Sequence, residues 1–153
     1  MKLHFLFFIF LFFACNSSEK KTTKLSLLSN PDNSFQFKTI QNDKLKESME
    51  RGEGIYNDFC INCHMAKGEG VGRTYPPLAN SDYLMENQEA SIHGIKYGMQ
   101  GKIVVNGQVY NNAMIPMGLE DEEIADVMNY INNSWGNKNE TLITAEQVSN
   151  IEK

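Results

Sequence analysis

Three residues that bind metals or react through sulfur lie within five positions of one another. Cys60, Cys63 and His64 stand in the stretch FCINCHMAKGEG, residues 59–70. Thiolate and imidazole are strong ligands for soft and borderline metals, and two neighbouring thiols can also be oxidised to a disulfide. Three kinds of chemistry fit this spacing: a structural metal site, a redox-active dithiol, or covalent attachment of a haem. Each of them predicts different residues elsewhere in the chain.

The first two of these sites lack the partners that they need. A structural zinc ion takes four ligands, and among residues 16–153 only His93 and acidic side chains could be added to Cys60, Cys63 and His64. A thioredoxin-like dithiol lies in a strand-helix-strand unit, whereas a helical pattern precedes Cys60 and few strands are predicted around it. The spacing C-x-x-C-H is itself typical of c-type haem attachment, in which the two thiols bond to the vinyl groups and the histidine lies under the iron. A single such motif predicts one haem.

Residues 1–14 have the pattern of an export signal. Lys2 precedes an unbroken apolar run from Phe5 to Ala14, which is too short to cross roughly 30 Å of hydrocarbon but long enough for a signal-peptide core. The run ends in FFAC, which resembles the lipobox of bacterial lipoproteins, although Phe12 stands where that family prefers leucine. The resemblance implies cleavage before Cys15 and lipid on its sulfur; the alternatives are an ordinary signal or an uncleaved anchor. Export agrees with haem attachment, which takes place outside the cytoplasm.

The charge of the exported chain argues against nucleic acid as a partner. Without residues 1–14 the chain has 13 basic and 19 acidic side chains, a net charge of −6, whereas phosphate binding needs the opposite sign. Residues 15–41 are rich in Ser, Thr, Lys and Asn and show no sustained period, so we expect a lipid-anchored tether. A flexible segment of that length has a root-mean-square span of roughly 25–30 Å.

Two amphipathic helices are predicted within a single domain, residues 42–136. The first begins near Asp43, and its apolar side repeats at steps of three and four residues and includes Gly52. The second lies in EDEEIADVMNYINNSW, residues 120–135. The acidic residues at its start stabilise the helix, because they lie at the positive end of the helix dipole. Short helical pieces are expected around residues 81–85 and 87–98.

Two smaller elements complete the expected fold. Asn106 and Gly107 lie between two β-favouring runs and predict a tight hairpin. The tail, residues 137–153, can add a short helix, since Thr144 with Gln147 three residues on forms a capping-box pattern.

The stretch from Leu45 to Trp135 resembles a class I c-type cytochrome. The matching features follow the order of that family: a glycine and aromatic residues on the first helix, then CINCH, GEGVG, YPPLA, AMIPMGL, and a last helix DEEIADVMNYI that ends in SWGN. The resemblance implies an all-α cytochrome c fold, in which the N- and C-terminal helices cross around one haem, with a small β-hairpin. It also implies that Gly52 allows close approach of an aromatic residue of the last helix, here Tyr130.

The resemblance assigns roles on the proximal side of the haem. Cys60 and Cys63 match the thioether pair, and His64 matches the proximal iron ligand. Pro76 matches the proline whose carbonyl accepts the other ring N–H of that histidine. Leu78 would pack on the face of the haem.

The sixth iron ligand is expected to be Met114, which matches the family's distal methionine. Ile115 stands where the family usually has a proline, so the turn can differ here. Met117, Met99 and His93 stay open as alternatives, as does an open iron site. For each methionine the alternative to ligation is packing in the core.

Ligation by histidine and methionine leaves no iron position for a substrate and favours reduced iron. The resemblance therefore implies that the chain is an electron carrier and is not itself an enzyme. We expect it to be exported, lipid-anchored to a bacterial membrane and periplasm-facing, passing single electrons from a respiratory donor to a terminal oxidase or reductase. The alternatives are a cytochrome subunit bound tightly to a larger oxidoreductase, and a gas sensor or peroxidase-like enzyme with an open iron site.

Overall fold

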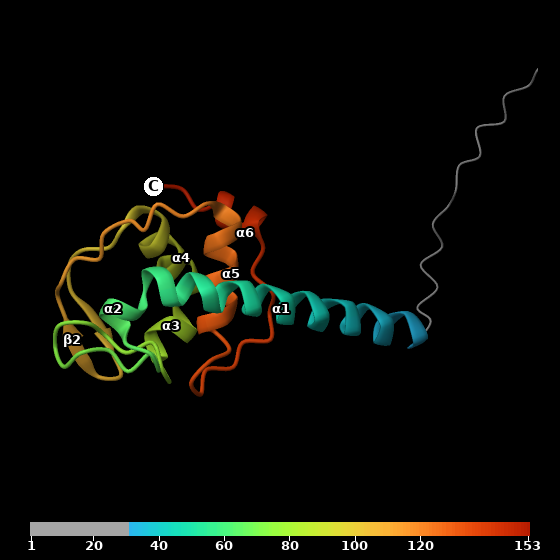
Figure 1. Cartoon of the computed structure of the whole chain (residues 1–153), viewed down its shortest axis with the longest axis horizontal. Helices are drawn as coiled ribbons and strands as arrows, with labels where there is room; N and C mark the ends of the chain where they lie inside the picture. Colours follow the sequence, from blue (N-terminus) through green and yellow to red (C-terminus); the bar gives the residue numbers. More distant parts are fainter. Residues whose placement is uncertain (1–30) are drawn as a thin grey trace, which may run out of the picture.

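The structure, a computed structural model, describes residues 31–153. Within this range, one long helix and several short helices surround a core, and one β-hairpin closes a side of it (Figure 1). This arrangement agrees with the predicted all-α fold with a small hairpin. The elements are α1 (Pro31–Phe59), α2 (Ile61–His64), α3 (Asp82–Glu86), α4 (Gln88–Tyr97), β1 (Ile103–Val105), β2 (Gln108–Tyr110), α5 (Asp121–Ile131) and α6 (Ala145–Ser149).

Helices α1 and α5 cross, and a glycine permits the close approach. A Cβ atom on Gly52 would overlap the backbone carbonyl oxygen of Asp126 and lie 2.9 Å from the Cβ of Tyr130. Any larger residue would push the helices apart. The predicted crossing is therefore present. The atom nearest to the Cβ position of Gly52 is the carbonyl oxygen of Asp126, and the Tyr130 side chain lies farther away.

The core lies between α5 and the other helices. The apolar stripe predicted on α5 is fully inside, because Ile124, Val127, Met128 and Ile131 are all buried. Burial of apolar surface is the main force that holds such short helices in place, since they are too short to be stable alone. The residues of this core cluster outside α5 come from α1, α3, α4 and the C-terminal tail: Tyr56, Leu84, Ile92, Ile95, Ile143 and Val148.

The C-terminal tail is part of the folded body. Val148 on α6 is fully buried, and the predicted cap is present, with the Thr144 hydroxyl accepting from the backbone N–H of Gln147. The Lys96 Nζ donates to the Val148 carbonyl at 2.9 Å and pairs with Asp121 at 3.0 Å, which fastens the tail to α4 and α5.

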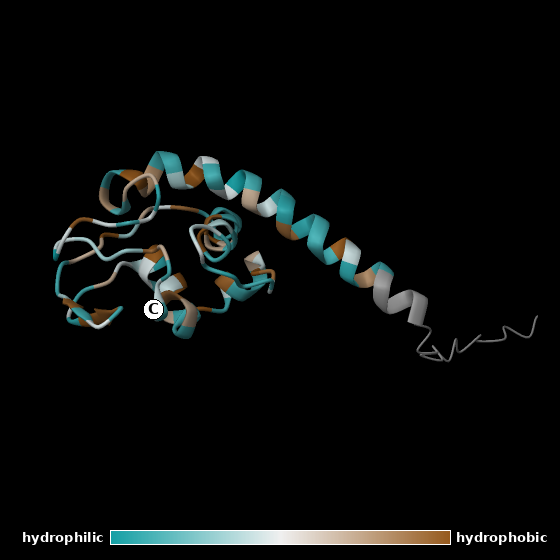
Figure 2. Cartoon of the chain, turned by 90° about the horizontal axis from the view of Figure 1, so that it is seen from below, coloured by the Kyte–Doolittle hydropathy of each residue, from teal (hydrophilic) through white to brown (hydrophobic). Residues whose placement is uncertain are grey.

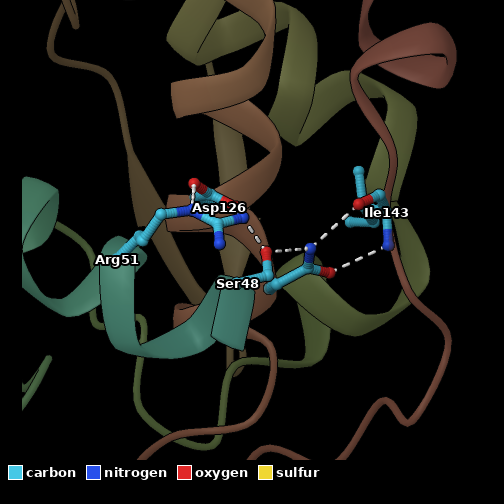
Figure 3. Close-up of polar contacts among 5 residues, drawn as sticks. Ser48, Arg51, Asp126 and Ile143 are labelled. Carbon is cyan, nitrogen blue, oxygen red and sulfur yellow. Dashed lines mark hydrogen bonds and ion pairs between the residues drawn. The ribbon is translucent and has the colours of Figure 1, made fainter. Parts of the chain in front are cut away.

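A buried polar network joins α1, α5 and this tail (Figure 3). Arg51 donates to both carboxylate oxygens of Asp126 at 2.6 and 2.7 Å, and the Ser48 hydroxyl donates to the same carboxylate at 2.6 Å. Asn129 donates to Ser48 and to the carbonyl of Ile143, and accepts from the Ile143 N–H. Every buried polar group here has a partner, so the network fixes the geometry of the crossing without an unpaired charge.

The hairpin and the start of α1 can be compared directly with the sequence. Strands β1 and β2 pair antiparallel, and Asn106 and Gly107 form the turn with positive φ values of 50° and 75°, as predicted. Helix α1 begins at Pro31, before the predicted start near Asp43, so residues 31–41 of the expected tether are helical here. That segment shows no sustained apolar period, which is the reason the sequence did not indicate a helix. The predicted signal peptide and residues 15–30 lie outside the described range.

Candidate functional site

The end of α1 and the single turn of α2 bring the C-x-x-C-H residues together. The helix breaks at Cys60, whose N–H still donates to the Tyr56 carbonyl at 2.9 Å, and His64 donates its backbone N–H to the Cys60 carbonyl at 2.9 Å. That bond places Cys60 and His64 one helical turn apart on the same side. Both thiols are free and half-buried. Before a thioether forms, burial raises the pKa of the Cys60 thiol to about 11, and the nearby Cys63 adds to the shift.

An aromatic cluster packs next to the turn of α2. The ring of Tyr56 lies 4.8 Å from that of Trp135 and 5.6 Å from that of Tyr130, between centroids. The Tyr56 hydroxyl donates to the Met65 carbonyl at 2.7 Å, next to His64, and burial raises the pKa of that hydroxyl. These contacts hold the end of α2 at a fixed place on the α1–α5 crossing.

The imidazole of His64 is held through its Nδ1 atom. That atom lies 3.0 Å from the Pro76 carbonyl oxygen, so the contact predicted for Pro76 is present. Gly70 makes it possible, because a Cβ there would lie 2.7 Å from the Pro76 carbonyl carbon, and its φ of 68° favours glycine. Burial lowers the pKa of His64, while the bond to Pro76 opposes the shift. The ring is therefore neutral at neutral pH, as a metal ligand requires.

His64 and Cys60 face an apolar cavity. A cavity of about 310 Å³ and a smaller one of about 80 Å³ share part of their lining, and among their lining residues there is no Asp, Glu, Lys or Arg. Cys63 and Pro76 line the larger one as well, and Leu78 lines the smaller one. The shared residues are Cys60, His64, Pro76, Met99, Ile103 and Met114.

Three methionines from the second half of the chain line the cavities. Met99 and Met114 pair as a short antiparallel bridge, in which the backbone nitrogen of each lies 2.8 Å from the carbonyl oxygen of the other. Both residues line both cavities. Met117 lines only the larger cavity, and His93 lines neither. Gly98 permits the bridge, since a Cβ there would lie 2.9 Å from the Met114 carbonyl oxygen. The structure thus brings Met114 to the cavity of His64 and leaves His93 outside it.

The pairing of Met99 with Met114 and the hairpin wall were not predicted. Ile103 and Tyr110 line the larger cavity, and the Tyr110 hydroxyl donates to the Gly72 carbonyl at 3.3 Å. The inward positions of β1 and β2 alternate with exposed Val104 and Val109, and this period of two was the available signal. The methionine bridge depends on a contact between distant segments and leaves no local pattern.

The larger cavity is open to the solvent on one side. Phe59 and Ile115 line it and are 46% and 72% exposed, respectively. A flat, largely apolar macrocycle with two reactive vinyl groups suits this lining, because two thiols, a neutral imidazole and methionine thioethers border the same cavity. The opening would leave one edge of such a group near the surface.

The chain has relatives among known proteins. A family model described as Cytochrome c matches residues 49–135, which contain every residue of the site described above. Cytochrome c-552 of Thermus thermophilus is 37% identical over 109 residues, which cover 65% of this chain and 82% of that protein.

Two further relatives are parts of dehydrogenases by name. The alcohol dehydrogenase (quinone), cytochrome c subunit, of Gluconacetobacter polyoxogenes is 33% identical over 104 residues, with 65% of this chain and 22% of that protein covered. The gluconate 2-dehydrogenase cytochrome c subunit of Pantoea cypripedii is 30% identical over 113 residues, with 70% and 25% covered.

Proposed function

Because the chain belongs to the cytochrome c family, we propose that it is a membrane-tethered carrier of single electrons between a respiratory donor and a terminal oxidase or reductase. As a cytochrome c it has a covalently bound haem c and transfers electrons; one C-x-x-C-H motif corresponds to one haem. The haem supplies an iron that alternates between the ferrous and ferric states. The residues of the chain determine how that iron is held and which molecules can reach it.

Four residues are proposed to hold the haem. Cys60 and Cys63 would bond to it through thioethers, and His64 would bind the iron through Nε2, since Nδ1 donates to Pro76. Met114, which lines both cavities together with His64, would supply the sixth ligand. A thioether is a soft donor, so it favours the reduced iron and a comparatively high potential.

The observation that carries this proposal is that His64 and Met114 line the same two cavities. If His64 and Met114 both bound the iron, no position on it would be left for a substrate. Electrons would then leave through the edge of the haem, at the opening between Phe59 and Ile115. The test is to reduce the purified holoprotein with a quinol-driven membrane preparation and to follow its reoxidation by a terminal oxidase. Failure of reduction by any membrane donor would contradict the proposal.

Tethering through Cys15 rests on the sequence pattern of residues 1–15. Within residues 31–153, no helix is both long and apolar enough to cross a membrane. Cys15→Ala is expected to move the exported protein from the membrane fraction to the soluble fraction. Mass spectrometry of the mature N-terminus checks the lipid directly. A variant that stays on the membrane, with no lipid on the wild-type Cys15, would indicate an uncleaved anchor.

A second function is favoured by the relatives named as dehydrogenase subunits. On this alternative the chain is a cytochrome subunit bound tightly to a larger oxidoreductase. The exposed apolar residues Phe59 and Ile115 at the opening of the cavity suit a permanent contact as well as a transient one. Purification from membranes in mild detergent separates the two: a stoichiometric dehydrogenase subunit in the pull-down favours the subunit, and its absence favours the free carrier.

An enzyme or gas sensor with an open iron site is the third alternative. It requires that Met114 does not bind the iron. Carbon monoxide added to the reduced wild-type protein tests it, because binding needs an open or easily opened position. Rapid binding would favour the sensor or peroxidase-like function over the electron carrier.

A further inference from the structure

The N-terminal part of α1 extends beyond the folded body (Figure 1). Every side chain from residue 36 to residue 44 is exposed, and Leu45 is the first buried residue among those of the helix whose burial is described. We call residues 31–44 the α1 extension. At 1.5 Å per residue it is roughly 20 Å long. A helix of this length is marginal by itself in water, so a surface that covers one side of it would stabilise it.

The coloured part of the α1 extension is mostly hydrophilic, with hydrophobic residues at intervals along the ribbon (Figure 2). Phe37 is 64% exposed and Ile40 is 51% exposed. Phe37, Ile40 and Lys44 follow one another at steps of three and four residues, so they lie along one side of the helix. A lysine beside apolar groups can place its stem with them and its ammonium in a polar layer.

The charge of the chain is divided between its two parts. Residues 16–46 contain six lysines and three acidic side chains, a net charge of +3. Residues 47–153 contain seven basic and sixteen acidic side chains, a net charge of −9. An anionic surface would therefore attract the N-terminal segment and repel the folded body. Residues 31–44 themselves contain two lysines and two acidic side chains, so the excess positive charge lies on both sides of the α1 extension, in residues 16–30 and at Lys46. Attraction of the flanking lysines would bring the neutral extension to an anionic surface.

We propose that the α1 extension lies on an anionic lipid surface, with Phe37 and Ile40 at the boundary of the acyl chains and the lysines among the headgroups. The inference rests on the membrane tethering proposed above and adds to it. Short helices with apolar side chains on one side and lysines around them bind in this way, and each lysine near an anionic surface strengthens binding by about fivefold. The extension would then lie along the membrane while repulsion holds the acidic body, with its haem edge, away from it.

The test uses the holoprotein with its lipid, purified in non-ionic detergent and reconstituted on vesicles. Hydrogen exchange of the amides of residues 36–46 is measured on vesicles of phosphatidylglycerol and phosphatidylcholine, and on phosphatidylcholine alone, at low and high salt. We expect exchange that is several-fold slower on the anionic vesicles at low salt, with most of the difference lost at high salt because salt screens the lysines.

Two variants and one control identify the contacts. Phe37→Ser with Ile40→Ser is expected to abolish the protection, and Lys38→Gln with Lys44→Gln to reduce it. Val104→Ser with Val109→Ser is the matched control, because these hairpin residues are 53% and 50% exposed and lie on the folded body. The control is expected to leave the exchange of residues 36–46 unchanged.

Three other results would overturn the proposal in different ways. Equal exchange on both kinds of vesicle, with the protein bound, would contradict the lipid contact and leave the tethering intact. Protection that persists in detergent and grows with protein concentration would show that a second copy covers the helix. A protein that binds neither vesicle would contradict the tethering as well. The electron-transfer function can be measured separately in each case.

Discussion

The Nδ1 atom of His64 lies 3.0 Å from the carbonyl oxygen of Pro76, in a loop that Gly70 allows to pack closely. A carbonyl only accepts hydrogen bonds, so Nδ1 donates and Nε2 keeps its lone pair. Burial lowers the pKa of His64, which keeps the ring neutral. The tautomer and the charge that an iron ligand needs are therefore fixed by the chain itself, and outer contacts of this kind orient metal ligands in general.

Replacing both Cys60 and Cys63 by Ala is expected to abolish covalent haem. The stable fold should be lost with it, since an apolar cavity of about 310 Å³ would be left without its contents. The measurement is a haem stain of the chain on a denaturing gel. Cys15→Ala is the matched control, and it should remain stained. Staining of the double variant would contradict the attachment assigned to these two residues.

Met114→Ala is expected to open the sixth position of the iron. The reduced variant should bind carbon monoxide, and its potential should fall because a soft thioether has been removed. Met99→Ala and Met117→Ala are the comparisons. Both residues are half-buried, so each should cost less than the roughly 2–5 kcal/mol of a fully buried methionine and leave the ligation intact. Carbon monoxide binding by the Met99 or Met117 variant alone would move the ligand to that residue.

The proximal half of the site could be read from the sequence, and the distal half only in part. Cys60, Cys63 and His64 lie within five consecutive positions at the single turn of α2, so local spacing already places them together. Met114 follows from the family pattern, but its bridge to Met99 forms between segments that are far apart in the chain. Such a contact depends on Gly98 and on the path of the intervening hairpin, and periodicity contains no information about either.

Gly52→Ala is expected to destabilise the holoprotein by about 1–3 kcal/mol or more, because its Cβ would overlap the Asp126 carbonyl oxygen at the helix crossing. Gly54→Ala is the matched control two residues along the same helix. Apart from the adjacent residues and the backbone of the same helix turn, no atom lies within 4 Å of a Cβ at Gly54. Alanine favours a helix interior by about 0.5–1 kcal/mol, so this variant should be slightly stabilised. Denaturant unfolding of both variants checks the prediction, and equal effects would show that the crossing can relax.

The sequence predicted the glycine at this crossing but not the polar network beside it. Gly52 interrupts an apolar helical pattern, which is a visible signal. Ser48, Asp126 and Asn129 look like ordinary surface residues of amphipathic helices, and yet all three are buried. They are satisfied by Arg51 and by the backbone of Ile143, a residue of the tail. The position of the tail on α5 decides their burial, and no local pattern reports that position.

Arg51→Ala is expected to destabilise the protein more than Asp126→Ala. The Asp126 side chain is 6% exposed and that of Arg51 is 53% exposed. Without Arg51, a buried carboxylate keeps only the Ser48 hydroxyl as a partner from this network, whereas Arg51 without Asp126 can turn to the solvent. Loss of one partner of a fully buried pair costs about 3–5 kcal/mol, and the exposure of Arg51 should reduce both values below that range. Denaturant unfolding of both variants gives the order, and the reverse order would indicate that Asp126 becomes solvated on its own.

Encounter with a redox partner is expected to depend on salt. The lining of the haem cavity contains no Asp, Glu, Lys or Arg, whereas Glu120, Asp121, Glu122 and Glu123 gather at the start of α5. The uncharged opening would make the contact, and the acidic helix start would guide the approach of a partner with a basic patch. The association rate should therefore fall by about one order of magnitude between low and high salt.

Glu122→Gln with Glu123→Gln is the variant that tests this guidance. The Glu123 carboxylate accepts the backbone N–H of Glu120 at 2.8 Å, and glutamine keeps an acceptor there while it removes the charge, so the helix start should survive. Glu140→Gln with Glu146→Gln removes the same charge from two exposed side chains of the tail and serves as the matched control.

The rate of electron transfer to membranes is measured for the wild type and both variants across a range of salt. We expect a weaker salt dependence for the α5 variant only. Equal profiles for the two variants would mean that net charge, and not this helix start, steers the partner, and a flat profile for the wild type would leave apolar contact and tethering as the basis of partner choice.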